Sequence, residues 1–181
     1  MFQQLRILAL SSALLGFTSV PALAQEEKKP VFTNAVADIG IVVKDLEKSA
    51  KFYTEVIGMT EVKGFDVPAE KATAFGLTDN QPASIRVFVM DNGKEGPQTK
   101  FKLMSFPKAP GKAQDQKFIH STVGFSYLTL FVTDMNASME RLKKAKVKLL
   151  GETPASLGGK NHIAVFHDPD GNFIEFIGPM E

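Results

Sequence analysis

The chain contains one pattern twice, and this repeat is its strongest constraint on the fold. The segment from Ile39 to Ser49 aligns without a gap on the segment from Leu128 to Ser138, so that Asp45 matches Asp134. The offset between the copies is too long for a solenoid repeat and fits a duplicated small module. Paired modules can place their sheets around a common cleft, where a function would lie.

Each copy predicts the same local structure. Apolar residues at every second position predict a strand with one buried face, and the Asp that follows can cap a helix. The alternating positions are Ile39, Ile41 and Val43 in the first copy and Leu128, Leu130 and Val132 in the second. Helical spacing of Leu46, Ala50, Tyr53 and Ile57 then predicts an amphipathic helix that ends at Gly58.

Further strands are predicted over residues 84–91, 101–106, 163–167 and 172–178. The predicted unit is therefore a strand, a helix and more strands, used twice. Residues 67–81 interrupt the first unit. This insertion could carry a short helix over 69–75. A cover over the mouth of a pocket is one interpretation of it, and a plain surface loop is the favoured one.

Residues 1–24 have the composition of a cleavable signal peptide. They combine Arg6, an apolar run over 7–20, and the small residues Ala22 and Ala24 before Gln25. The apolar run is short for a membrane span, so export to the periplasm or the medium is favoured over a membrane anchor. The chain has no Cys, which excludes disulfides, thiolate chemistry and a lipoprotein anchor.

The remaining chain divides by composition into a leader and one domain. We predict an exposed leader over 25–36 and a domain over 37–179, with module one at 37–107, a linker at 108–123 and module two at 124–179. Loss of Arg6 with the signal peptide leaves acidic and basic side chains balanced. The mature chain thus lacks the excess of positive charge that is typical of nucleic-acid-binding proteins. No membrane contact is expected after cleavage.

Two segments carry a family resemblance. Residues 38–59 and 166–176 resemble the opening and closing signatures of the vicinal oxygen chelate superfamily, which includes glyoxalase I, bleomycin resistance proteins and extradiol dioxygenases. The resemblance covers about residues 37–179. It implies an α+β fold of two tandem βαβββ modules whose curled sheets enclose one cavity, and it does not specify a reaction.

The resemblance also implies four positions that hold a divalent metal in the metal-binding members. The matching residues here are Asp38, Lys102, Tyr127 and Glu175, and only Glu175 keeps the usual chemistry. Asp38 could supply an oxygen ligand, but an ammonium has no lone pair and Tyr127 is a poor ligand unless ionised. No metal is therefore favoured; if one binds, Glu175 and Asp38 would hold it. We expect Lys102 instead to pair with Glu175 or Asp38.

Strand parity places these positions on the face opposite the helix. The predicted ligand-binding wall consists of Asp38, Lys102, Tyr127, Thr129, Phe131, Phe173 and Glu175. Its mixture of apolar and few polar groups suits a small, partly apolar ligand. His162 and His167 have opposite parity and His120 lies in the linker, so structural roles are favoured for all three.

Two classes of function are consistent with this wall. The favoured one is an exported glyoxalase-like protein with a degenerate metal site that binds a small ligand. The alternative is an enzyme: a metal-dependent lyase, isomerase or epimerase with an atypical ligand set, or a metal-free one with Glu175 or Asp38 as base. A homodimer is compatible with either class, and the sequence does not identify the ligand.

Overall fold

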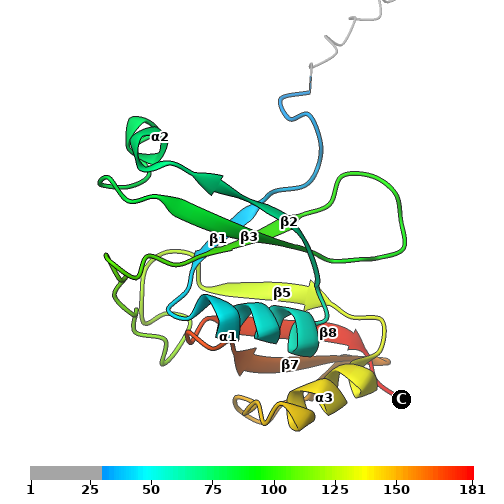
Figure 1. Ribbon diagram of the computed structural model, residues 1–181. Helices are drawn as coiled ribbons and strands as arrows, with labels where there is room; N and C mark the ends of the chain where they lie inside the picture. Colours follow the sequence, from blue (N-terminus) through cyan, green and yellow to red (C-terminus); the bar gives the residue numbers. More distant parts are fainter. Residues whose placement is uncertain (1–29) are drawn as a thin grey trace, which may run out of the picture. The chain divides into compact units, whose positions relative to one another are not determined.

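The two copies of the repeat fold into two modules with the same succession of elements (Figure 1). Module one contains β1 (Ile39–Val42), α1 (Leu46–Lys51) continued by a π-helical segment η1 (Phe52–Ile57), β2 (Thr60–Val67), α2 (Ala69–Ala74), β3 (Ala83–Val89) and β4 (Lys100–Met104). Module two contains β5 (Tyr127–Phe131), α3 (Met135–Lys144), β6 (Ala155–Gly158), β7 (Asn161–His167) and β8 (Phe173–Pro179).

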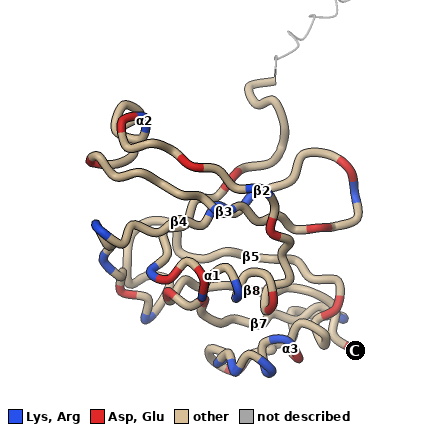
Figure 2. Tube along the Cα trace, viewed as in Figure 1, with Lys and Arg blue, Asp and Glu red and all other residues tan. Residues whose placement is uncertain are grey.

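This computed structural model describes residues 30–181. The predicted signal peptide over 1–24 and the start of the leader lie outside the described residues. Between residues 30 and 181, no helix is long and apolar enough to span a membrane. Charged residues of both signs are interspersed along both modules (Figure 2).

Sheet order confirms the duplication. Sheet A has the order β1-β4-β3-β2 and sheet B has the order β5-β8-β7-β6, which are the same arrangement in the two modules. In each sheet the first and last strands of the module pair in parallel and the other neighbours are antiparallel. The predicted α+β fold of two βαβββ modules is therefore present, with an additional short helix, α2, between β2 and β3.

The predicted helix starts are confirmed by their caps. The side chain of Asp45 accepts a hydrogen bond from the Lys48 amide at 3.0 Å, and Asp134 accepts one from Ala137 at 3.0 Å. Each carboxylate satisfies one of the free amides of the first helical turn. Gly58 ends the first helix with a φ of 94°, a left-handed conformation that favours glycine.

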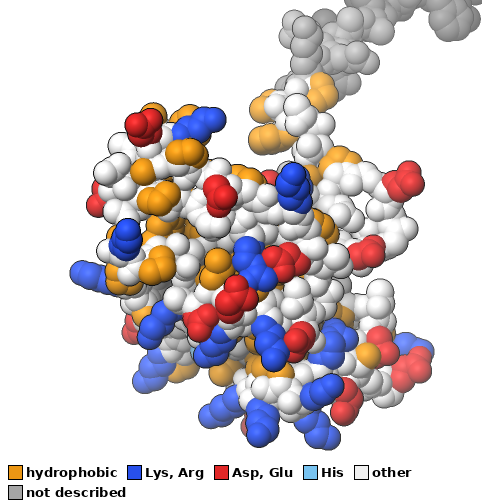
Figure 3. Space-filling model, in the orientation of Figure 1, with side chains coloured by type: hydrophobic (Ala, Val, Ile, Leu, Met, Phe, Trp, Pro, Cys, Tyr) orange, Lys and Arg blue, Asp and Glu red, His pale blue; other side chains and the backbone are white. Residues whose placement is uncertain are grey.

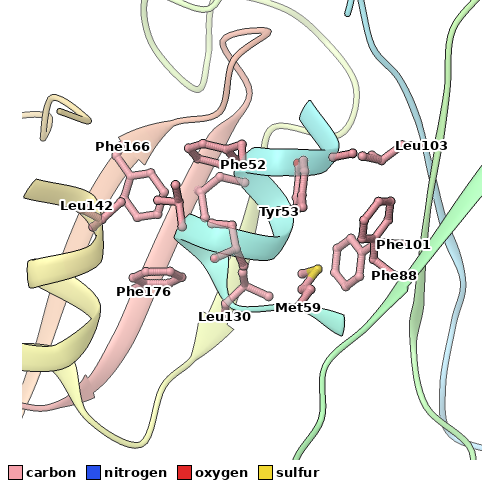
Figure 4. Packing of buried hydrophobic residues seen from close by; sticks show 14 of the residues in the cluster. Phe52, Tyr53, Met59, Phe88, Phe101, Leu103, Leu130, Leu142, Phe166 and Phe176 are labelled. Atoms are coloured by element: carbon pink, nitrogen blue, oxygen red, sulfur yellow. The ribbon is translucent and has the colours of Figure 1, made fainter. Parts of the chain in front are cut away.

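One hydrophobic core unites the two modules. The first helix lies between two groups of buried side chains, one from each sheet (Figure 4). Phe52 packs its ring against Phe166 of sheet B at 6.5 Å between centroids, and Tyr53 stacks on Phe101 of sheet A at 6.4 Å. Both sheets therefore bury their helix-facing sides in the same core.

The turn between β7 and β8 also joins the modules. The Tyr53 hydroxyl donates a hydrogen bond to Asp168 Oδ2 at 3.0 Å, and Ser49 Oγ donates one to Asp170 Oδ2 at 3.1 Å. The Lys44 amide donates to Asp170 Oδ1 at 3.0 Å. Burial, together with the negative charge of Asp168, raises the pKa of the Tyr53 hydroxyl, so it remains a donor. The carboxylates of this turn thus fix module two on the first helix of module one.

The opposite faces of the two sheets lie on the sides remote from this core. Val42 on sheet A is 53% exposed, and Tyr127 and Phe131 on sheet B are 55% and 81% exposed. The two sheets are separate and do not close on each other. The enclosed cavity expected from the sequence is therefore not formed by one chain, and each sheet presents an open face instead.

Candidate functional site

The open face of sheet A carries an ion pair at two of the four predicted metal positions. Lys102 Nζ lies 2.7 Å from Asp38 Oδ2, and the Lys100 amide donates a hydrogen bond to Asp38 Oδ1 at 3.3 Å. β1 and β4 run in parallel with Gly40 opposite Lys102, so the lysine reaches diagonally to the residue before β1. The hydrogen bond from Lys102 holds the pKa of the Asp38 carboxyl below its usual range.

The Lys102 ammonium also lies against an aromatic ring. Nζ is 5.9 Å from the centroid of Phe65 on β2, which is close enough for a cation–π interaction. The lysine side chain is 27% exposed and that of Asp38 is 39% exposed. Two partners, Asp38 and Phe65, therefore hold the ammonium of a half-buried lysine.

The open face of sheet B carries the other two positions. Thr129 lies opposite Glu175 in the parallel pair of β5 and β8, and Thr129 Oγ1 donates a hydrogen bond to Glu175 Oε2 at 2.7 Å. Tyr127 lies opposite the buried Phe173 one row away, and Phe131 lies opposite Ile177. The predicted wall residues of module two thus share one face, on which Glu175 is the carboxylate.

His167 belongs to the same face, although sequence reasoning gave it a structural role. It lies opposite Phe173 across β7 and β8, in the row that contains Tyr127. Its ring meets the Phe173 ring at 4.4 Å between centroids, and Nε2 is buried without a hydrogen-bond partner among the described residues. Counting parity back from Glu175 through the tight turn would have placed it here. His162 lies opposite Gly178, on the other face, as its parity predicts.

The predicted positions therefore form two half-sites in one chain. Asp38 and Lys102 meet on sheet A, and Thr129 and Glu175 meet on sheet B. In the part of the chain that the structure describes, no hydrogen bond or ion pair joins one half-site to the other. The expected pairing of Lys102 is thus with Asp38 and not with Glu175.

The two half-sites offer different groups to a divalent metal ion. On sheet A the one carboxylate is already bonded to an ammonium, which would repel an added cation and offers no lone pair. Glu175 on sheet B has a hydroxyl partner and a tyrosine in the neighbouring row, neither of which is a good ligand when neutral. His167 lies in the row of that tyrosine, and its imidazole is a common metal ligand. Residues 30–181 contain no group of three or more His, Cys, Asp or Glu side chains placed to share an ion.

The sequence is similar to proteins of a known family. The family model described as "Glyoxalase/Bleomycin resistance protein/Dioxygenase superfamily" matches residues 35–176. The chain is 30% identical over 142 residues to a lactoylglutathione lyase of Pseudomonas putida, covering 76% of this chain and 80% of that protein.

Solved structures resemble the fold at lower identity. A glyoxalase family protein from Bacillus cereus matches with a TM-score of 0.67 and 20% identity, covering 87% of this chain and 100% of the other. An antibiotic-binding protein from a Streptomyces species matches with a TM-score of 0.51 and 22% identity, covering 81% and 96%. At these identities the likeness concerns the fold.

Proposed function

The chain belongs to the Glyoxalase/Bleomycin resistance protein/Dioxygenase superfamily, and from this membership we propose that it is an exported member that binds a small, partly apolar ligand without a divalent metal. The observation that carries the proposal is the contact of 2.7 Å between Lys102 Nζ and Asp38 Oδ2. It supports the proposal because it puts a positive charge at one of the four positions to which the family resemblance assigns a metal ligand.

The residues around this pair suit a ligand with one acceptor group and an apolar body. Lys102 can offer a further N–H to a carbonyl or carboxylate while it stays bonded to Asp38, because an ammonium has three donors. Phe65 beside it and Tyr127, Phe131 and Phe173 on sheet B supply aromatic surface. A few polar groups on an otherwise apolar wall are typical of small-molecule sites.

A ligand that touches both half-sites needs two chains. The open face of sheet A has the Lys102–Asp38 pair, whose ammonium has N–H groups to spare, and the open face of sheet B has the acidic Glu175, so the faces of two copies could share a charge-assisted hydrogen bond. The exposed Tyr127 and Phe131 add apolar surface to such a contact. The proposed ligand-binding form is therefore a homodimer with its sites between sheet A of one copy and sheet B of the other.

The second candidate is an enzyme of the type named in its relatives. It is favoured by the 30% identity to a lactoylglutathione lyase over 80% of that protein. In this case Glu175, held by Thr129, would be the general base on sheet B. Such an enzyme would need either a metal bound by Glu175 and Asp38 after Lys102 is displaced, or a mechanism without one.

Calorimetry distinguishes the metal-free binding protein from the metal-dependent enzyme. Purified protein is titrated with Mg²⁺, Mn²⁺, Ni²⁺ and Zn²⁺, and then with lactoylglutathione with and without each metal, while sedimentation velocity reports the oligomeric state. We expect no metal to bind in the micromolar range, and any lactoylglutathione binding to be independent of metal. Tight binding of one equivalent of metal that is abolished in Glu175→Gln would establish the metal-dependent enzyme instead.

Export is the part of the proposal that concerns the N-terminus. The basic residue Arg6, the apolar run and the small residues Ala22 and Ala24 support cleavage before Gln25. N-terminal sequencing of the protein from its native host should therefore begin at or near Gln25. A membrane-bound protein that retains Met1 would contradict export by cleavage.

A further inference from the structure

A pocket lies under the insertion that carries α2, on the open face of sheet A and one row from Lys102. It has a volume of about 360 Å³ and opens between α2, the open face of sheet A and the loop that follows β4. Hydrophobic side chains gather below α2 on the surface of this region (Figure 3). The lining residues include neither Asp38 nor Lys102, and all of them belong to one chain. The pocket thus lies beside the half-site on sheet A and does not include its ion pair.

Its walls are mainly apolar. Val42, Met104 and Ile85 occupy one row across β1, β4 and β3, and Val67 lies opposite Ala83 at the end of β2 and β3. Ala72, which is 1% exposed, anchors α2 above them. Phe106 and Ala109 from the loop after β4 form the third side. Such walls favour a hydrocarbon body, because its burial removes apolar surface from water.

Some polar side chains of the pocket lining already have hydrogen-bond partners in the protein, and one does not. Thr78 Oγ1 donates to the Gln81 carbonyl at 2.8 Å and accepts from the Gln81 amide at 3.2 Å, and Gln81 Nε2 donates to the Asp79 carbonyl at 3.4 Å. These groups satisfy one another within the turn. The Asp79 carboxylate has no hydrogen bond or ion pair with any residue of the described chain, and it is the charged side chain of the lining.

We infer that this pocket binds an aliphatic or aromatic amine, with the hydrocarbon body between α2 and sheet A and the ammonium at Asp79. An ammonium would gain a charge-assisted hydrogen bond to a carboxylate that has no partner in the chain. A ligand carboxylate at the same place would be repelled. The inference does not depend on the proposed function, because neither half-site contributes to the pocket.

Three probes with one hydrocarbon body and different end groups test the charge assignment: 4-phenylbutylamine, 4-phenylbutanol and 4-phenylbutyrate. Binding to purified protein is followed by NMR titration of the methyl groups. We expect the amine to bind about two- to fivefold more tightly than the alcohol, the range for a solvent-exposed charge pair, and the carboxylate to bind most weakly. Asp79→Asn should bring the amine to the affinity of the alcohol. Equal or tighter binding of the carboxylate would overturn the assignment of an amine.

Two variants test the place of binding. Ala83→Leu fills the pocket from the sheet and should weaken all three probes at least tenfold, whereas Ala74→Leu on the exposed side of α2 should leave them unchanged. Should Ala83→Leu fail to fold, Ala109→Trp fills the pocket from the exposed loop and carries the same expectation. Unchanged affinities in a folded filling variant would show that the probes bind elsewhere and would overturn the inference.

Discussion

Asp168→Ala is expected to lower the free energy of unfolding by roughly 3 to 5 kcal/mol, because hydrogen bonds to a charged acceptor contribute about 1.5 to 3 kcal/mol each. Asp168 is 5% exposed and accepts hydrogen bonds from the Tyr53 hydroxyl, from the Asp170 and Asn172 amides and from Asn172 Nδ2, at 2.8 to 3.0 Å. Alanine would leave these donors without an acceptor in a buried place. Urea unfolding followed by circular dichroism measures the loss.

Two further variants separate the contact between modules from the turn itself. Tyr53→Phe removes only the hydrogen bond from Tyr53 to Asp168, one of three from module one to this turn, and about 1.5 kcal/mol is expected for it. Asp91→Ala is the matched control, because Asp91 accepts a similar local bond from the Gly93 amide at 2.9 Å but lies on the surface. Its effect should stay within about 0.5 kcal/mol. An Asp168→Ala protein as stable as Asp91→Ala would refute this account of the turn.

Lys102→Glu is expected to increase the affinity of the half-site on sheet A for divalent metal ions. The substitution places a second carboxylate beside Asp38 in place of the ammonium that now lies 2.7 Å away. Without metal the variant should be less stable than the unmodified protein, since two like charges are adjacent. Added Mn²⁺ or Mg²⁺ should bind the oxygen pair and stabilise the folded state, by about 2.7 kcal/mol at a hundredfold excess over Kd. Melting curves with and without metal measure both effects.

Lys102→Gln is the control for this prediction, since it removes the cation and adds no carboxylate. It should gain no metal affinity, and the pKa of Asp38, measured by NMR, should rise toward the ordinary value of 3.8. In the unmodified protein the pKa of Asp38 is lower in the folded than in the unfolded state. The Lys102–Asp38 pair therefore stabilises the fold at pH values above the unfolded-state pKa of Asp38, and this stabilisation is lost as the pH falls through its folded-state pKa. A Lys102→Glu protein that binds metal no better than Lys102→Gln would refute the charge-replacement argument.

Local sequence patterns were sufficient to predict most elements of the fold. The strands at β3, β4, β7 and β8, the caps Asp45 and Asp134 and the turn after the first helix are confirmed because each depends on neighbours in the chain. β2 and β6 were not predicted. β2 contains Gly64 and a shift of register between Val62 and Phe65, and its side chains are mostly exposed, so no regular apolar alternation marks it.

The insertion shows a second limit of local patterns. The short helix considered over 69–75 is present as α2 (Ala69–Ala74), but the favoured interpretation of residues 67–81 as a plain surface loop is wrong, since the insertion lines an apolar pocket. Ala72 is buried only because sheet A and the loop after β4 approach it from distant parts of the chain. A six-residue helix has too few hydrogen bonds to be stable by itself, so its stability comes from tertiary packing that the segment does not encode alone.

By itself, then, the sequence determined the two modules and the face on which each candidate side chain lies, because the alternation of a strand and the capping of a helix are set by neighbouring residues. Tertiary structure decided which candidates meet. Lys102 pairs with Asp38 because β4 lies beside β1 in the sheet, and it does not reach Glu175 because both sheets pack their helix-facing sides into one core and turn their other faces away from it. That choice depends on where two sheets bury their apolar area, which is a property of the assembled core and not of any segment.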